Sequence, residues 1–171
     1  MKRAEHPMQL NVFNEVSEQE AAEVLRPCID IERWINDLVS ARPFSTLEDL
    51  NESAARSAQP FKDDEIAAAL AHHPRIGERA SGDSQEASLS RGEQSTLNLN
   101  ADVTARLAVA NREYEERFDR VFLIRAAGRT SEEILAECQR RLGNTDEAEL
   151  AEVADQLRQI ALLRLQDAVK N

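Results

Sequence analysis

The sequence predicts an all-α fold, a single-domain helical bundle of about eight helices spanning residues 1–171. Three observations predict it. Ala, Glu, Leu and Arg are abundant, whereas the chain has only 5 Gly, 5 Pro and 4% aromatic residues, a composition that favours helix. Apolar residues recur at helical spacing along most of the chain. Finally, Ser17, Ser90 and Thr130 each precede a Glu by three positions, which is the pattern of a helix-starting capping box.

Four helices are expected in the N-terminal part, after an irregular start over residues 1–16 whose first ten residues form a tail. His6-Pro7 favours that extended start. The helices are predicted at about 17–26, 28–40, 47–58 and 63–71. The first has a capping box, the second has an apolar face at helical spacing, and the last two begin at the cap residues Thr46 and Asp63.

The stretch after the fourth helix is the most irregular part of the chain. Pro74 disfavours a helical conformation at His73. Residues 74–89 contain two glycines, several small polar residues and no apolar period, so they are predicted to form a long loop. Loops of that length within a compact domain are uncommon and often functional. Ser90 and Glu93 then predict the start of the next helix.

Three longer helices are expected in the C-terminal part. They are predicted from Asn100 or Asp102 to Phe118, over residues 130–142 up to Gly143, and over residues 146–169. The run 121–124 is the only β-like stretch. Because no other stretch of similar character could pair with it, a buried connection is expected there instead of a strand.

Charge and cysteine content narrow the class of protein. The formal net charge of −11 argues against binding to nucleic acid or to an anionic membrane surface. Cys28 and Cys138 are far apart and lack ligand spacing, which fits a reduced intracellular protein. The first ten residues lack the apolar core of a signal peptide, and no apolar run approaches the ~20 residues of a membrane span. A cytoplasmic location is therefore expected.

His73 is the first candidate for chemistry. Pro74 restrains the backbone beside it, and an imidazole with a reference pKa near ~6.5 suits proton transfer at neutral pH. The alternative is a histidine that only caps the end of the fourth helix. A zinc site from His72, His73 and Glu78 is a poor match, because adjacent histidines rarely converge on one ion. No metal is expected.

Glu93 and Arg164 each allow two interpretations. In a capping box Glu93 would bond only to the backbone of Ser90, whereas a helix N-terminus with Ser90 and Gln94 beside it could also bind an anion. Arg164 continues the apolar stripe of the last helix, where a guanidinium must find a partner. That partner is either a substrate carboxylate or a buried acid in a structural pair, unless the side chain extends to solvent near the chain end.

Several short motifs occur in an order that resembles a known family. They are Phe13-Asn14, Trp34, Arg42-Pro43-Phe44, His73-Pro74-Arg75-Ile76-Gly77, Ser90-Arg91-Gly92-Glu93-Gln94, Asn111-x-x-Tyr114-x-x-x-Phe118 and Ile160-x-x-x-Arg164-Leu165. Together, over nearly the whole chain, they resemble 2-oxo-4-hydroxy-4-carboxy-5-ureidoimidazoline (OHCU) decarboxylase, an enzyme of urate degradation. One departure is Ser95-Thr96-Leu97, where many relatives have an Ala-Gly-Leu run.

The resemblance implies an all-α, cofactor-free and usually dimeric enzyme that converts OHCU, a small molecule, to (S)-allantoin and carbon dioxide. It implies that His73, Glu93 and Arg164 are catalytic. The residues expected to line the substrate are Pro74, Ser90, Glu93, Gln94, Leu123, Ile124, Arg125 and Ala126. Two competing functions are a helical protein-interaction module without catalysis and a related hydrolase of the ureide pathway.

Overall fold

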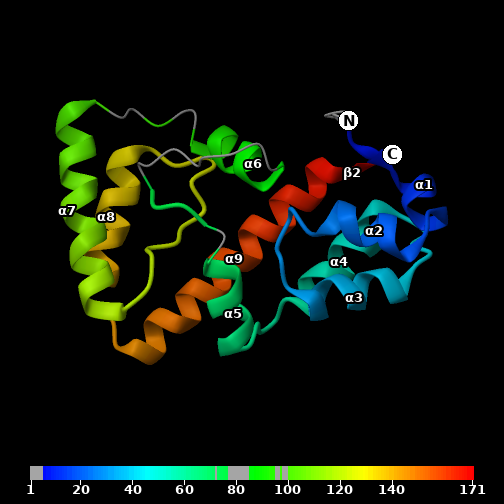
Figure 1. The fold of residues 1–171 in the computed structure, drawn as a ribbon, viewed down its shortest axis with the longest axis horizontal. Coiled ribbons are helices and arrows are strands. Elements are labelled where there is room, and N and C mark those ends of the chain that lie inside the picture. The colour runs from blue at the N-terminus through cyan, green and yellow to red at the C-terminus, as the bar shows by residue number, and fades with distance from the viewer. Residues whose placement is uncertain (1–5, 72, 77–84, 95–96, 98–99) are drawn as a thin grey trace. The chain divides into compact units, whose positions relative to one another are not determined.

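The computed structural model describes residues 6–71, 73–76, 85–94, 97 and 100–171, with the backbone alone at 85–88 and 90. Within these residues nine helices and two short strands follow one another (Figure 1). They are β1 (Met8–Gln9), α1 (Leu10–Glu15), α2 (Glu18–Leu25), α3 (Glu32–Ala41), α4 (Leu47–Ser57), α5 (Asp63–Leu70), α6 (Gln85–Gln94), α7 (Ala101–Phe118), α8 (Ser131–Arg141), α9 (Asp146–Ala168) and β2 (Val169–Lys170). The predicted all-α class is confirmed, with nine described helices against about eight expected.

The chain forms two compact units. The first consists of Met1–Glu65 and Arg158–Asn171, and the second is Ile66–Leu157. The expectation that residues 1–171 form a single domain stays a prediction, and the two units are described one at a time.

The first unit is built around buried aromatic side chains. Phe13 and Trp34 are fully buried, and the Trp34 indole N–H donates to the Ala54 carbonyl at 3.0 Å. Helix α3 packs against both α2 and α4. Strand β1 pairs in parallel with β2, with Met8 opposite Val169, so this unit joins segments from both ends of the sequence.

The irregular tail predicted for residues 1–10 is wrong at residues 8–10, and the irregular start is wrong up to Glu15. Two causes explain the difference. Strand β1 exists because a partner strand lies about 160 positions later in the sequence, which no local pattern shows. Helix α1 is only six residues long and places Leu10 and Phe13 one turn apart, where both are buried. A single pair at that spacing is a weak signal for a helix.

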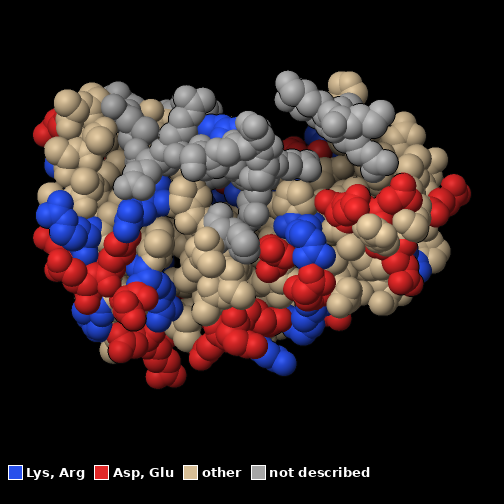
Figure 2. Space-filling view, in the orientation of Figure 1, with Lys and Arg blue, Asp and Glu red and all other residues tan. Residues whose placement is uncertain are grey.

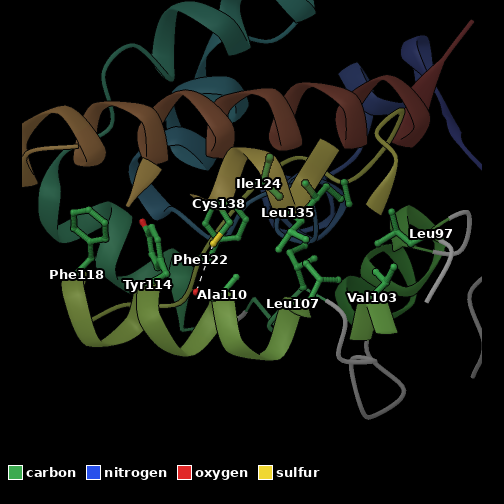
Figure 3. Close-up of a cluster of buried hydrophobic side chains, with 13 residues drawn as sticks. Leu97, Val103, Leu107, Ala110, Tyr114, Phe118, Phe122, Ile124, Leu135 and Cys138 are labelled. Carbon is green, nitrogen blue, oxygen red and sulfur yellow. Dashed lines mark hydrogen bonds between the residues drawn. The ribbon is translucent and has the colours of Figure 1, made fainter. Parts of the chain in front are cut away.

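The second unit is built around a hydrophobic cluster between α7 and α8, called here the α7–α8 core (Figure 3). Its members are Ile76, Leu97, Val103, Leu107, Ala110, Tyr114, Phe118, Phe122, Ile124, Ala126, Ile134, Leu135 and Cys138. Five of these lie at helical spacing along one face of α7. Phe122 and Ile124 come from the irregular connection between the two helices, so the predicted buried connection is confirmed.

Local cap patterns set several helix starts. Ser17 and Thr130 form complete capping boxes with Glu20 and Glu133, as predicted. The Asn100 side chain accepts from the Val103 N–H at the start of α7. On the face seen in Figure 2, acidic and basic side chains are interspersed. None of the described helices is long and apolar enough to cross a membrane.

Candidate active site

His73 lies directly after α5, at the start of a segment that α7 holds in place. Its N–H donates to the Leu70 carbonyl at 3.1 Å, which adds one bond to the end of the helix. Three residues later, the Asn111 side-chain amide donates to the Ile76 carbonyl at 2.9 Å, and Ile76 is buried. The half-buried His73 and Pro74 are therefore connected to α5 on one side and to α7 on the other.

A pocket of about 340 Å³ lies beside this segment. Its lining residues are Arg75, Ile76, Thr104, Leu107, Ala108, Asn111, Arg112 and Glu115. Arg75 and Glu115 form two bonds within that lining, at 2.5 and 3.1 Å. The lining contains Ile76 and Asn111, the two residues whose hydrogen bond anchors the segment after His73.

Glu93 lies in the last turn of α6, so the helix start predicted at Ser90 is wrong. Helix α6 begins at Gln85 and ends at Gln94. The loop predicted for residues 74–89 is therefore wrong at 85–89, and its residues 77–84 lie outside the described residues. Gln, Glu, Ala and Leu are good helix formers, but this helix is mostly polar and lacks the apolar period that reveals the others. Ser90 therefore lies within α6 and not at a helix N-terminus.

The stretch Leu123–Ala126 lies in the irregular connection between α7 and α8. Three of its side chains are buried and that of Arg125 is half-buried. Two side chains from later helices bind its backbone. Arg141 Nη1 donates to the Leu123 carbonyl at 2.8 Å, and the Arg125 N–H donates to Gln156 Oε1 at 2.9 Å.

The α7–α8 core contains residues of two of the predicted stretches, together with Leu97, which follows the third in sequence. Ile76 comes from the segment that begins at His73, and Leu97 lies three residues after Gln94. Ile124 and Ala126 come from residues 123–126, and all belong to the same cluster. Figure 3 labels Leu97 and Ile124 among the cluster side chains. The half-buried Glu93 and Gln94 lie just before Leu97 in sequence, whereas the Ser90 side chain lies outside the described residues.

Arg164 belongs to the first unit. It is 3% exposed, which confirms that it lies on the inward side of α9. Its Nη1 donates to the Pro27 carbonyl at 3.0 Å, so one of its partners is a backbone carbonyl. A guanidinium has five N–H donors, and this contact uses one of them.

A buried ion pair in the second unit was not predicted. Arg141 and Glu149 are 1% and 0% exposed and are 2.5 Å apart. Tyr114 donates to the same carboxylate, and Asn144 donates to it at 3.0 Å. The Arg141 guanidinium also lies 4.6 Å from the centre of the Phe122 ring. Helical spacing in the sequence indicates that Arg141 is buried, because it lies three positions after Cys138 and seven after Ile134, on the buried face of α8.

Burial also sets the protonation of two groups in this core. It raises the pKa of Tyr114, and the hydrogen bond to Glu149 adds to that effect, so the phenol stays a neutral donor. Burial raises the pKa of the Cys138 thiol to about 11, so the thiol is protonated at neutral pH. Among the described residues, no three His, Cys, Asp or Glu side chains are grouped as metal ligands are. His72 and Glu78 of the rejected zinc site lie outside those residues.

Comparison with known proteins agrees with this arrangement of motifs. Residues 14–166 match the OHCU decarboxylase family. The chain belongs to that family.

Several curated relatives are similar over most of this chain. The 2-oxo-4-hydroxy-4-carboxy-5-ureidoimidazoline decarboxylase of Amia calva is 31% identical over 134 residues, which cover 77% of each chain. The protein of that name in Haloferax volcanii is 25% identical over 162 residues and is covered to 95%. The uric acid degradation bifunctional protein of Bacillus sp. (strain TB-90) is 24% identical over 164 residues, but this chain spans only 32% of its length.

Two solved structures share the fold. A crystal structure of OHCU decarboxylase in the presence of (S)-allantoin superposes with a TM-score of 0.71 at 23% identity, covering 88% of this chain and 96% of the other. A crystal structure of (S)-allantoin synthase gives a TM-score of 0.69 at 15% identity, covering 95% of this chain and 54% of the other. Both similarities concern the arrangement of the helices.

Proposed function

We propose that this chain catalyses the decarboxylation of OHCU to (S)-allantoin and carbon dioxide in urate degradation, with His73, Glu93 and Arg164 as catalytic residues. Membership of the OHCU decarboxylase family supports the reaction. The observation that supports His73 and residues 123–126 is the shared hydrophobic cluster, in which Ile76, Leu97 and Ile124 belong to one core. Glu93 and Arg164 lie outside that cluster and are assigned from their motifs.

The chemistry of the substrate defines what the protein has to supply. OHCU carries its carboxylate on a carbon that also bears a hydroxyl and adjoins a ring C=N. When the bond to carbon dioxide breaks, its electron pair can delocalise onto the ring nitrogen. The ring nitrogen and the ureido-bearing carbon must then each gain a proton, and the hydroxyl loses its proton as it becomes a carbonyl, so one proton is taken up overall. These steps require orientation and proton transfer, so the proposal includes no metal or organic cofactor.

Each catalytic residue has a role that its chemistry suits. His73 exchanges protons with the hydroxyl oxygen or with the carbon that becomes the stereocentre. Arg164 binds the carboxylate or the negative charge that develops as it leaves, through its planar set of donors. Glu93 orients His73 or accepts hydrogen bonds from the ureido N–H groups. Pro74, Ser90, Gln94 and residues 123–126 line the substrate.

The proposal extends to the state of the protein in the cell. We infer a homodimer in the cytoplasm that acts on a small molecule and binds neither nucleic acid nor membrane. The net charge of −11 supports the last point, since nucleic acids and cytoplasmic membrane surfaces are anionic. Analytical ultracentrifugation of the purified chain measures the oligomeric state directly.

Turnover of freshly generated OHCU, followed by circular dichroism of the allantoin formed, tests the function. The substrate is labile and decays unaided to racemic product, so optical activity separates catalysis from background. We expect (S)-allantoin from the parent chain and only the slow racemic background from His73→Asn, which keeps hydrogen bonding but cannot cycle a proton near neutral pH.

Other outcomes of the same experiment would contradict the proposal. An interaction module would leave the spontaneous rate unchanged, and a ureide hydrolase would consume OHCU faster without forming (S)-allantoin. If His73→Asn forms (S)-allantoin at the parent rate, His73 has a structural role. Activity that disappears on dialysis against EDTA and returns with zinc would overturn the cofactor-free mechanism.

A further inference from the structure

The backbone of residues 123–126 is held mainly by side chains that come from outside the segment. The segment is neither helix nor strand, so its peptide groups need other hydrogen-bond partners. Arg141 binds the Leu123 carbonyl at 2.8 Å, Gln156 accepts from the Arg125 N–H at 2.9 Å, and Arg129 Nε donates to the Arg125 carbonyl at 3.0 Å. Two consecutive peptide groups, on either side of Ile124, are therefore each held by one side chain.

Because peptide groups are planar, these two contacts fix the directions in which the Ile124 carbonyl and the Ile124 N–H point. Both peptide bonds are trans, and in a planar trans peptide the C=O and the N–H point in opposite directions. Gln156 binds the N–H of the 124–125 peptide, so the Ile124 carbonyl points away from Gln156. Arg141 binds the C=O of the 123–124 peptide, so the Ile124 N–H points away from Arg141. The Ile124 side chain itself is buried in the α7–α8 core.

Gln156 differs from Arg141 in how much of the fold depends on it. Arg141 is fully buried and paired with Glu149, so its loss would disturb the whole second unit. Gln156 is half-buried on α9, and it accepts one hydrogen bond from the Arg125 backbone N–H. Its side chain can therefore be changed to test the orientation of one peptide group alone.

We propose that Gln156 is a positioning residue of the active site: by holding the 124–125 peptide plane, it directs the Ile124 carbonyl at an N–H donor of the bound ureide. The inference rests on the proposed function, in which residues 123–126 line the substrate. A ureido group and an imidazoline ring both present N–H donors, and a carbonyl in a fixed orientation accepts from such a donor without reorganisation. Gln156 does not itself touch the substrate.

Three variants of the full-length protein test this role. Gln156→Met keeps the length of the side chain but removes the acceptor, and Gln156→Glu restores an acceptor oxygen at the same length. Gln139→Met is the matched control, because Gln139 is exposed on α8. Steady-state kinetics with OHCU, affinity for (S)-allantoin, the melting temperature and amide hydrogen exchange at Arg125 are measured for each.

We expect Gln156→Met to raise KM by about three- to ten-fold with kcat within about two-fold of the parent, the effect of losing one ground-state hydrogen bond. Affinity for (S)-allantoin should fall by a similar factor, and the Arg125 amide should exchange faster. Gln156→Glu should restore KM and allantoin affinity, and Gln139→Met should match the parent throughout.

Failure of this inference is distinguishable from failure of the proposed function. If the parent turns over OHCU and Gln156→Met has an unchanged KM, Gln156 does not position the site. If Gln156→Glu is as impaired as Gln156→Met, or if the loss follows a lowered melting temperature, the role is structural. A parent chain that does not accelerate OHCU decay overturns both the function and the inference.

Discussion

At the scale of single residues, the charge of Glu93 can be isolated by one substitution. Glu93 is half-buried in the last turn of α6, so its carboxylate has no part in starting that helix. Glu93→Gln keeps the size and hydrogen-bonding capacity of the side chain, and both residues favour helix about equally. We expect the free energy of unfolding to change by less than ~1 kcal/mol, while turnover of OHCU falls by about 10²-fold.

Urea denaturation and steady-state kinetics on the same preparation separate these effects. Glu132→Gln, at an exposed position of α8, is the matched control and should leave turnover unchanged. Normal turnover in Glu93→Gln would mean that the carboxylate has no catalytic role.

Arg164 is proposed to bind the substrate carboxylate, and one substitution tests whether the shape or the charge of its side chain matters. Arg164→Lys keeps the positive charge and can still donate to the Pro27 carbonyl, but it loses the planar fork that binds a carboxylate through two parallel bonds. We therefore expect kcat/KM to fall by about ten-fold or more, with a smaller proportional effect on folding.

The measurement is kcat/KM for OHCU beside a thermal melt. If Arg164→Lys is as active as the parent, Arg164 is not the residue that binds the substrate carboxylate. If the melting temperature of the variant is far below that of the parent and activity falls in proportion, the buried guanidinium has a structural role.

At the scale of elements, the Arg141–Glu149 pair connects α8 to the start of α9. Arg141→Met would leave the Glu149 carboxylate buried without its cation, and breaking a buried pair on one side costs about 3–5 kcal/mol. Arg141→Met with Glu149→Met should recover part of that loss because no unpaired charge remains. Recovery should be incomplete, since Tyr114, Asn144 and the Leu123 carbonyl also lose a partner.

Urea denaturation of both single variants and the double variant gives the coupling free energy. A cost below about 1 kcal/mol for Arg141→Met would mean that the pair is not a major support of this core.

The elements that could be predicted are those whose cause is local. The capping boxes at Ser17 and Thr130 form as predicted, because every atom involved lies within four residues. The same pattern at Ser90 gave a wrong helix start, because helical residues precede Ser90 and α6 begins at Gln85. The pattern identifies a possible cap but cannot exclude a helix that continues through it.

The residues of the candidate site stay a prediction, which motifs alone allowed for the stretches around His73, Glu93 and Leu123. Ile76 and Ile124 from two of these stretches, and Leu97 three residues after Gln94, belong to one core. Gln156 could not be predicted, because its role depends on a contact with Arg125 across 31 positions. Nothing in its local sequence distinguishes it from the other glutamines of α9.

At the scale of the whole molecule, surface ion pairs make the free energy of unfolding depend on pH. The hydrogen bonds and charge of Arg140 lower the pKa values of Glu137 and Glu152. A lowered folded-state pKa stabilises the protein above the ordinary glutamate pKa of about 4.3, and that stabilisation is lost as the pH falls through the lowered values.

Arg140→Gln should therefore destabilise the protein at pH 7 and have no effect at a pH well below the lowered pKa values. Because all three side chains are partly exposed, high salt should reduce the effect at pH 7. Urea denaturation of parent and variant at both pH values measures it. A difference between the two proteins that does not change with pH would show that these carboxylates are not the cause.

The pairing of β1 with β2 has a consequence for how the chain folds as it is synthesised. Met8 leaves the ribosome about 160 residues before Val169, its partner in the sheet. At about 5–20 residues per second, that interval is roughly 8–32 s. The second unit is continuous in sequence and can form during this time, whereas the first unit cannot be completed until the last turns of α9 and strand β2 have been translated.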